Sequence, residues 1–231
     1  MKERPILFNG DMVRAILEGR KTQTRRVMKP QPEKDSIRDE HWWPSNMHQS
    51  MVYIESEMQQ WQGLAGDCFP HGGIGDRLWV RETWSVHPAM DEYKPSDIST
   101  DNSVDYIAGP DRFSGFGKTR PSIFMPRWAS RITLEITAVR VERLQDISEE
   151  DAKAEGARRM DDLPGIHPYG QDCRWSMESP KNTEGCLSTA RWAFANYWCK
   201  LARGKNDILF HEEYWDANPW VWVIEFKRVD V

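Results

Sequence analysis

A short basic stretch near the N-terminus holds the residues best suited to chemistry. It covers residues 19–26, GRKTQTRR, and places Lys21 three positions before Thr24. A lysine can act as a base or contact a phosphate, and a threonine hydroxyl can act as a nucleophile once a neighbour removes its proton. The arginines around the pair would attract an anionic ligand such as a nucleotide. A basic surface that simply faces water is the alternative interpretation.

The charge of the chain is distributed unevenly, which favours a local anion site. The whole chain has a formal net charge of −5. Residues 1–29 hold eight basic and three acidic side chains, a net of +5, so the other 202 residues sum to −10. An acidic protein does not suit nonspecific coating of nucleic acid. Its basic segment suits one small anionic ligand or a short piece of nucleic acid.

Tryptophan is unusually frequent, with 12 in 231 residues. Aromatic rings stack on nucleobases, so this surplus fits a protein that binds a base. It fits a large aromatic core equally well, and that is the default interpretation for each ring. Trp42, Trp43 and Trp84 are the tryptophans for which a ligand contact is most worth considering.

Length and composition narrow the class of protein. A chain of 231 residues can bury a proper core. No apolar run approaches the roughly 20 residues that span a bilayer. Residues 1–8 lead directly into polar sequence, without the apolar region of a secretory signal. P-loop and dinucleotide fingerprints are absent. We therefore expect a cytoplasmic protein that contacts no membrane and needs no cofactor.

The cysteines predict neither a disulfide framework nor a strong metal motif. Cys68, Cys173, Cys186 and Cys199 are too few for a disulfide-stabilised chain of this length. Cys68, His71, Cys173 and Cys186 could supply four zinc ligands, but the spacing lacks a second short pair. Free cysteines and no bound metal are the expectation.

Hydrophobic periodicity predicts the order of helices and strands. A first helix carries apolar residues at helical spacing, is capped by Asn9 or Asp11, and ends at Gly19. A slip in the alternation near Ala138 predicts a β-bulge, and Ser148 opens a near capping box for a second helix. The expected strands are residues 5–8, 22–28, 78–84, 130–144 and 220–229, and a third helix covers residues 187–202.

These elements predict an α+β fold. Five or six strands with helices near the edges and no βαβ alternation favour a small mixed β-barrel over a doubly wound sheet. We expect one domain over residues 1–231, with loop-like insertions at about residues 30–71, 86–125 and 160–185. One short element is possible near residues 51–61. Because residues three apart on a strand point to opposite faces, the chain must bend for Lys21 and Thr24 to share a site.

Four segments together resemble the ASCH family, a branch of the PUA-like β-barrels. They are residues 16–26, residues 75–82 with a Gly-Asp turn before a strand, residues 144–156 and the closing strand at residues 221–227. They cover roughly a third of the chain and occur in the order that the family expects. The length and the tryptophan-rich insertions are most similar to uncharacterised ASCH-like proteins of phages and prophages. The resemblance implies a PUA-like fold with long inserted loops.

The resemblance also implies a reaction. Small bacterial 4-acetylcytidine amidohydrolases of this family use a lysine, a threonine and a glutamate, which fall here on Lys21, Thr24 and Glu155. It implies Thr24 as nucleophile, Lys21 as base and Glu155 as proton donor. The residues expected to bind substrate are Arg20, Arg25, Arg26, Arg81, Glu82 and Trp84, with a structural ion pair as the alternative for Arg81 and Glu82.

Three functions remain open at the level of sequence. The first is an amidohydrolase that acts on an acylated cytosine nucleoside or nucleotide. The second is a non-catalytic module that binds RNA or a modified base, of phage origin. The third is a nuclease that uses the same cationic cleft. The expected partner in each case is a nucleoside, a nucleotide or a short RNA.

Overall fold

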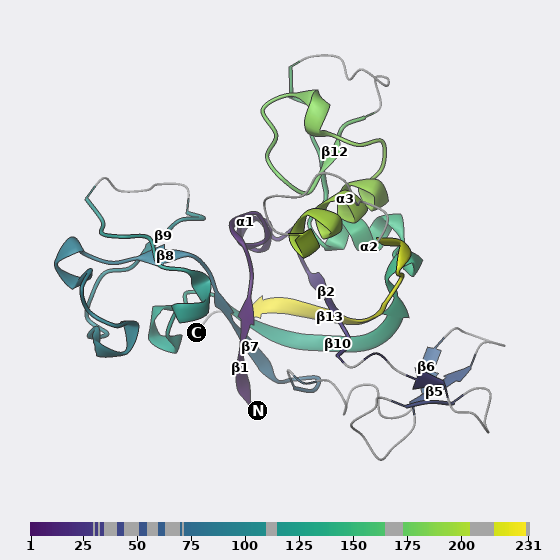
Figure 1. Cartoon of the computed structure of the whole chain (residues 1–231), viewed down its shortest axis with the longest axis horizontal. Helices are drawn as coiled ribbons and strands as arrows, with labels where there is room; N and C mark the ends of the chain where they lie inside the picture. The colour runs from purple at the N-terminus through teal and green to yellow at the C-terminus, as the bar shows by residue number, and fades with distance from the viewer. Residues whose placement is uncertain are drawn as a thin grey trace.

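The computed structural model describes most of the chain. The described residues are 1–29, 31, 33–34, 41–43, 51–54, 60–62, 70, 72–109, 115–164, 173–203 and 215–229. They form a mixed α+β structure around one five-stranded sheet, with two helices grouped on one of its faces (Figure 1). The predicted α+β class is therefore confirmed. Within the described residues, no helix combines the length and the apolar character needed to cross a membrane.

The main sheet has the strand order β1-β7-β10-β13-β2. Its strands are β1 (Glu3–Leu7), β2 (Gln23–Val27), β7 (Arg77–Arg81), β10 (Thr133–Arg143) and β13 (Trp220–Val229). β1 pairs with β7 in parallel, and the other neighbours pair antiparallel. β10 and β13 are the long central strands and curve strongly (Figure 1). The register shift between Ile136 and Ala138 confirms the predicted bulge.

The sheet is open, so the barrel that the sequence predicts is not closed by backbone pairing. β1 and β2 are its two edges, and no ladder joins them in the described part of the chain. Helix α1 (Gly10–Leu17) connects these edge strands and packs Val13 and Ile16 into the core between them. Side chains complete the closure: Arg26 Nη2 donates to the Leu7 carbonyl oxygen at 2.6 Å. Helix α1 and the Arg26 side chain therefore take the place of the backbone hydrogen bonds that would join β1 to β2 in a closed barrel.

Helix α1 begins and ends as its sequence predicts. The Asn9 side chain accepts a hydrogen bond from the Met12 N–H and thereby caps the first turn. Gly19 follows the last helical turn with a φ of +74°, which a glycine adopts without a steric penalty. The chain reverses there and enters β2, which is the bend that a shared site for Lys21 and Thr24 requires.

Helices α2 (Glu149–Ala154) and α3 (Ala190–Arg203) lie together over one face of the sheet (Figure 1). The predicted capping box is present, because Ser148 accepts from the Asp151 N–H and Asp151 accepts from the Ser148 N–H. α3 begins later than predicted, at Ala190. The Glu149 carboxylate accepts the N–H groups of Ala190 and Arg191 at 3.0 and 3.1 Å and so fixes the start of this helix.

Side chains of β13 separate two cores, one on each face of the sheet. Trp222, Ile224 and Phe226 belong to the core that α1 covers. Val221 and Val223 point the other way, into the core formed with α2 and α3. Successive side chains of β13 therefore point to opposite faces of the sheet, one covered by α1 and the other by α2 and α3. The neighbouring strand β2 lies between the same two layers.

The three predicted insertions contain more structure than loops. Residues 84–129 hold β8 (Trp84–Ser85), β9 (Asp105–Tyr106) and the short 3-10 helices η1 (Pro88–Met90), η2 (Pro95–Asp97), η3 (Ser122–Phe124) and η4 (Arg127–Ala129). They enclose a third core around Trp84, Val86 and Met125. Burial of Trp84 in this core explains why β7 ends at Arg81, three residues before the predicted end.

The other two insertions add small sheets. A four-stranded antiparallel sheet comprises β3 (Glu33–Lys34), β4 (His41–Trp43), β5 (Met51–Ile54) and β6 (Gln60–Gln62). β5 and β6 fall where one short element was predicted. The third insertion holds β12 (Trp175–Ser176) and η6 (Thr183–Gly185), and β12 pairs with β11 (Arg158–Arg159), which lies just before the predicted start of the insertion. The short helix η5 (Leu144–Asp146) links β10 to α2.

Candidate functional site

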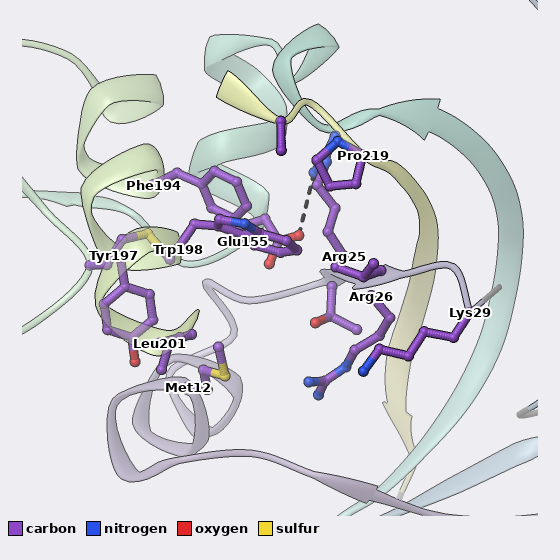
Figure 2. Close-up of a pocket in the computed structure, with 14 residues that line it drawn as sticks. Met12, Arg25, Arg26, Lys29, Glu155, Phe194, Tyr197, Trp198, Leu201 and Pro219 are labelled. Carbon is purple, nitrogen blue, oxygen red and sulfur yellow. Dashed lines mark hydrogen bonds and ion pairs between the residues drawn. The ribbon is translucent and has the colours of Figure 1, made fainter. Parts of the chain in front are cut away.

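A cavity of about 680 Å³ opens along β2, between α1 and α3 (Figure 2). Side chains from both faces of β2 line the cavity, because β2 is an edge strand of the sheet. Residues of α1, α3 and the segment before β13 form most of the rest of the wall, and Lys29, Glu155 and Met177 complete it. The lining residues are Met12, Thr24, Arg25, Arg26, Val27, Lys29, Glu155, Met177, Phe194, Tyr197, Trp198, Leu201, Ala217 and Pro219.

The two sides of the cavity differ in chemistry. Phe194, Tyr197 and Trp198 of α3 form an aromatic wall, while Arg26 and Lys29 extend from the β2 side across from it (Figure 2). The ring centres of Phe194 and Trp198 lie 5.8 Å apart. The Tyr197 hydroxyl donates to Asn9 Oδ1 at 2.8 Å, and burial raises the pKa of Tyr197, so this hydroxyl stays protonated. An aromatic wall facing cations suits a planar ring that carries an anionic group.

The free edge of β2 brings backbone groups to the cavity. The Phe226 N–H donates to the Thr22 carbonyl at 2.9 Å, and the Met28 N–H donates to the Trp220 carbonyl at 3.0 Å. In an antiparallel ladder with constant register, every second residue makes such bonds. The N–H and C=O groups of Arg25 and Val27 therefore point away from β13, towards the open edge along which the cavity lies.

The segment before β2 binds to the C-terminal end of α2. Three consecutive carbonyl oxygens there accept hydrogen bonds from three consecutive residues of the basic stretch. The Ala154 oxygen accepts from the Thr22 N–H at 2.8 Å, the Glu155 oxygen from Lys21 Nζ at 3.0 Å and the Gly156 oxygen from Arg20 Nη1 at 2.6 Å. The last carbonyls of a helix have no partner within the helix and attract cations. This contact places Lys21 beside Glu155, 134 positions later in the chain.

Lys21 and Glu155 form a buried ion pair. Lys21 Nζ lies 2.6 Å from Glu155 Oε2, and the two side chains are 0 and 2% exposed. Burial lowers the pKa of Lys21, and the Glu155 carboxylate opposes that shift without cancelling it. A lysine with a lowered pKa can exist as the neutral amine that a base requires.

Arg25 contacts carboxylates, so the structure does not support it as a phosphate ligand. Its Nη2 lies 3.0 Å from Glu142 Oε2 and 3.1 Å from Asp151 Oδ2, and its Nη1 lies 3.4 Å from Glu155 Oε1. The guanidinium is fully buried. Burial opposes ionisation of Asp151, but hydrogen bonding from Gln23 and the charge of Arg25 outweigh it and hold the pKa of Asp151 below its usual value. Arg25 thus orients Glu155.

Two of the three predicted catalytic residues line the cavity, and the third contacts one of them. Thr24 is buried and lies on the cavity wall, as does Glu155. Lys21 is not among the residues that line the cavity, and its ammonium lies behind the Glu155 carboxylate. The structure therefore brings the threonine and the glutamate to one wall, with the lysine in contact with the glutamate.

The predicted substrate-binding residues divide into two groups. Arg26 lines the cavity, with its guanidinium 5.3 Å from the centre of the Phe8 ring. Arg20 does not line it; it pairs with Glu18 at 2.7 Å and bonds to the Gly156 carbonyl. The role of Arg20 is therefore to hold the turn before β2 against α2.

Arg81, Glu82 and Trp84 lie away from this cavity, which corrects their assignment to the same pocket. Arg81 stacks on Trp79 at 4.7 Å. Glu82 accepts two hydrogen bonds from Arg131, each 2.9 Å, and burial raises the pKa of Glu82. Trp84 is fully buried in the third core. The strand β7 lies two positions from β13 in the sheet, so its residues cannot reach the free edge of β2.

Sequence reasoning missed the aromatic wall and the carboxylates around Arg25. Phe194, Tyr197 and Trp198 follow the three- and four-residue spacing of one helix face, which was visible in the predicted helix. Spacing alone does not distinguish a core face from a face that lines a cavity. Glu142 and Asp151 carry no signal of their own, because each is an ordinary carboxylate until the fold places it beside Arg25.

The metal alternative concerns residues that are only partly described. Cys68 and His71 lie outside the described residues, as do the side chains of Trp42 and Trp43. Cys173 and Cys186 are free thiols, and burial raises the pKa of Cys186. Among the described residues, no three His, Cys, Asp or Glu side chains form a group that could hold a metal ion.

No protein-family model, curated protein or solved structure matches this chain. The geometry of the cavity is therefore the basis for a functional proposal.

Proposed function

We propose that the cavity binds a nucleoside or nucleotide and that Thr24, Lys21 and Glu155 hydrolyse an acyl amide on its base. One observation carries the proposal. The buried Lys21–Glu155 pair, 2.6 Å long, adjoins a cavity that Thr24 also lines and that has an aromatic wall on one side and cations on the other. Buried charge with a lowered lysine pKa beside an open cavity is typical of a functional site.

The cavity offers a partner for each part of a nucleotide. The base would stack on Phe194 and Trp198, and stacking of this kind contributes about 1–3 kcal/mol per base. A phosphate would reach Arg26 and Lys29 on the opposite side. The backbone groups of Arg25 and Val27 would hydrogen-bond the edge of the base, as an unpaired strand edge can do.

The reaction follows from the order of groups at the wall. The Thr24 hydroxyl oxygen attacks the acyl carbonyl carbon, and its proton passes to neutral Lys21 through the adjoining Glu155 carboxylate. Collapse of the tetrahedral intermediate breaks the C–N bond, and the Lys21 ammonium returns the proton to Glu155, which delivers it to the departing amine. Water then hydrolyses the acyl-threonine ester, which releases a carboxylic acid and restores the hydroxyl.

The family assignment belongs to the same proposal. The turn at Gly19, the pair formed by Lys21 and Glu155, and the position of Thr24 on the cavity wall agree with what the ASCH resemblance implies. We propose that the open curved sheet, closed by α1, is a PUA-like fold with three structured insertions. Its segment 173–187 contributes Met177 to the cavity wall.

A binding module without turnover is the second candidate, and one observation favours it. Both Glu155 oxygens are engaged, Oε2 by Lys21 and Oε1 by Arg25. A glutamate held in this way is well placed to build a rigid pocket wall, and a lysine that stays ionised could not act as a base. The same cavity would then recognise a modified base or a short RNA.

Hydrolysis of 4-acetylcytidine, followed by absorbance, tests the reaction. We expect turnover by the wild-type protein and a loss on the order of 10²–10⁴-fold in Thr24→Ala. Thr22→Ala is the matched control, because Thr22 is an exposed threonine of the same segment that uses only its backbone groups to bond α2 and β13. Equal losses in both variants would contradict a role for Thr24 in the reaction.

Binding of the same compound, measured by quenching of tryptophan fluorescence, separates the two candidates. The enzyme predicts that Thr24→Ala binds 4-acetylcytidine and does not turn it over. Binding by the wild-type protein with no turnover at any pH would favour the module. Absence of both would overturn the proposal that the cavity takes a nucleoside.

A further inference from the structure

A second cationic hollow, of about 430 Å³, lies at the far end of β13 and shares no residue with the first cavity. Three arginines contribute to its wall, two from the segment at residues 127–131 and one from β13. The lining residues are Leu17, Arg127, Ser130, Arg131, Thr133, Arg228 and Val229. None of these arginines belongs to the basic stretch that the sequence singles out.

Carboxylates hold Arg127 and Arg131 in place and use only some of their N–H donors. Arg127 Nε lies 2.9 Å from Glu3 Oε2, and its Nη2 lies 3.4 Å from Thr133 Oγ1. Arg131 gives Nε and Nη2 to Glu82, at 2.9 Å each. In both guanidinium groups the Nη1 nitrogen makes none of these bonds. A guanidinium held in place loses less conformational entropy when it binds a ligand.

Arg228 is the third cation, and no carboxylate among the described residues compensates its charge. Its side chain is exposed, and it has no ion pair with any carboxylate in the described part of the chain. The hollow thus combines three guanidinium groups with the two carboxylates Glu3 and Glu82 that pair with Arg127 and Arg131, a net charge of +1. A hydrogen bond from Arg127, together with the charges of Arg127 and Arg77, holds the pKa of Glu3 below its usual value, so Glu3 stays ionised near neutral pH.

We propose that this hollow binds a phosphate group, with Arg228 as its principal ligand and Arg127 and Arg131 as oriented partners. Guanidinium groups present planar pairs of N–H donors that match the oxygen spacing of phosphate. The hydroxyl of Ser130 donates to the Val80 carbonyl at 2.8 Å and shapes the floor of the hollow instead of binding the anion.

The position of the hollow suggests where such a phosphate comes from. Helix α1 borders both sites, through Met12 at the first cavity and Leu17 at the hollow. Along β13, Arg228 follows Ile224 by four residues, and Ile224 pairs with Thr24. Four strand residues correspond to about 13 Å. A short single-stranded nucleic acid could therefore place one nucleotide in the cavity and a backbone phosphate in the hollow, whereas a free nucleotide or inorganic phosphate would occupy the hollow alone. This last step rests on the proposed function; the phosphate site itself does not.

The charge-removing variant Arg228→Gln tests the site, with Lys227→Gln as matched control. Lys227 is the preceding exposed residue of β13, points to the opposite face of the sheet and pairs with Glu135 at 2.8 Å. Both substitutions remove one positive charge from an exposed side chain, and both variants should fold as the wild type does. Binding is measured with two probes: inorganic phosphate by titration calorimetry, and a fluorescent single-stranded RNA of about ten nucleotides by anisotropy at several salt concentrations.

We expect Arg228→Gln to weaken binding of a probe about 5–10-fold, because it removes a charge-assisted contact. With RNA it should also reduce the salt dependence of log K by about 0.7, the value of one phosphate contact on a single strand. If Arg228→Gln weakens binding of both probes, the hollow binds a phosphate of a nucleic-acid backbone. If it weakens binding of inorganic phosphate alone, the hollow binds a small anion. Equal effects of the two variants, or no effect of Arg228→Gln on either probe, would overturn the site. Turnover of 4-acetylcytidine, which lacks a phosphate, reports separately on the first cavity.

Discussion

The Lys21–Glu155 pair stands out at the scale of single residues because it is costly to bury. Each ion loses its hydration, and the attraction between the two repays that loss only in good geometry. Here Lys21 Nζ bonds both to the Glu155 carboxylate and to its carbonyl oxygen, while Arg25 approaches the second carboxylate oxygen. A hydrophobic pair of similar volume would fill the same space more cheaply. The proposed reaction at the cavity, more than stability, would account for these side chains.

Removal of one partner should destabilise the fold unequally. Glu155→Gln leaves Lys21 buried without a carboxylate, and we expect a loss of about 3–5 kcal/mol in the free energy of unfolding. Lys21→Met should cost less, because Arg25 still faces Glu155. Urea denaturation of both variants and of the double variant measures this. The double variant should lose less free energy of unfolding than the two single variants lose together. A loss equal to their sum would show that Lys21 and Glu155 do not interact.

The contact between the turn at residues 19–22 and the end of α2 matters most at the scale of elements. It satisfies three helix carbonyls with Arg20, Lys21 and Thr22 and thereby sets the position of β2. Two glycines permit it. Gly19 ends α1 with a φ of +74°, and Gly156 ends α2 with a φ of +114°. The proposed catalytic geometry therefore depends on two glycines at helix ends, neither of which has a side chain of its own.

The two glycines should respond differently to alanine. A Cβ at Gly19 meets no atom within 4 Å, whereas a Cβ at Gly156 would lie 3.0 Å from the Ala15 Cβ. Gly19→Ala therefore bears only the cost of the left-handed conformation, about 1–2 kcal/mol. Gly156→Ala bears a comparable cost and must also push α1 away from α2. We expect it to be the more destabilising in thermal or urea unfolding and to reduce ligand binding. Equal effects would show that α1 and α2 tolerate the added methyl group.

At the scale of the whole molecule, a network of charges joins the sheet to α2. Arg25 of β2 contacts Glu142 of β10 and Asp151 of α2. Arg140 of β10 contacts Asp151 at 2.9 Å and also pairs with Glu142 and with Glu225 of β13. The network therefore ties three strands and a helix together just behind the cavity. Its integrity should depend on the ionisation of its carboxylates.

The network predicts a loss of stability in acid. The pKa of Asp151 is lower in the folded chain than in the unfolded one. Its contribution is then present above the unfolded value of about 3.9 and is lost as the pH falls through the folded value. Asp151→Asn should be less stable by about 1–2 kcal/mol near pH 7, since a charged hydrogen bond is removed from each arginine. In urea unfolding at several pH values, the gap to the wild type should shrink below about pH 4.

A matched carboxylate sharpens this test. Glu150, also in the first turn of α2, is largely exposed and pairs only weakly with Lys153. Glu150→Gln should leave both the stability near pH 7 and its dependence on acid close to those of the wild type. A gap between Asp151→Asn and the wild type that stays constant down to pH 3 would show that Asp151 does not titrate with the network.

The sequence by itself determined the local elements. Apolar spacing, the Asn9 cap, Gly19 and the capping box of Ser148 and Asp151 indicated where α1 and α2 begin and end, and the apolar run at residues 220–229 indicated β13. These signals act between residues only a few positions apart, so they can be seen without the fold. The pattern also singled out Lys21 and Thr24, because two reactive side chains stand in one basic stretch.

Tertiary structure decided what those residues contact. Only folding brings Lys21 to Glu155, and Arg25 to Glu142, across 134 and 117 positions of sequence. It opened the sheet where a barrel was predicted, because α1 covers the gap between the edge strands. It also turned the aromatic face of α3 into a cavity wall and gathered three arginines beside β13. Such contacts depend on the pairing of distant strands, and the types of the residues alone do not determine it.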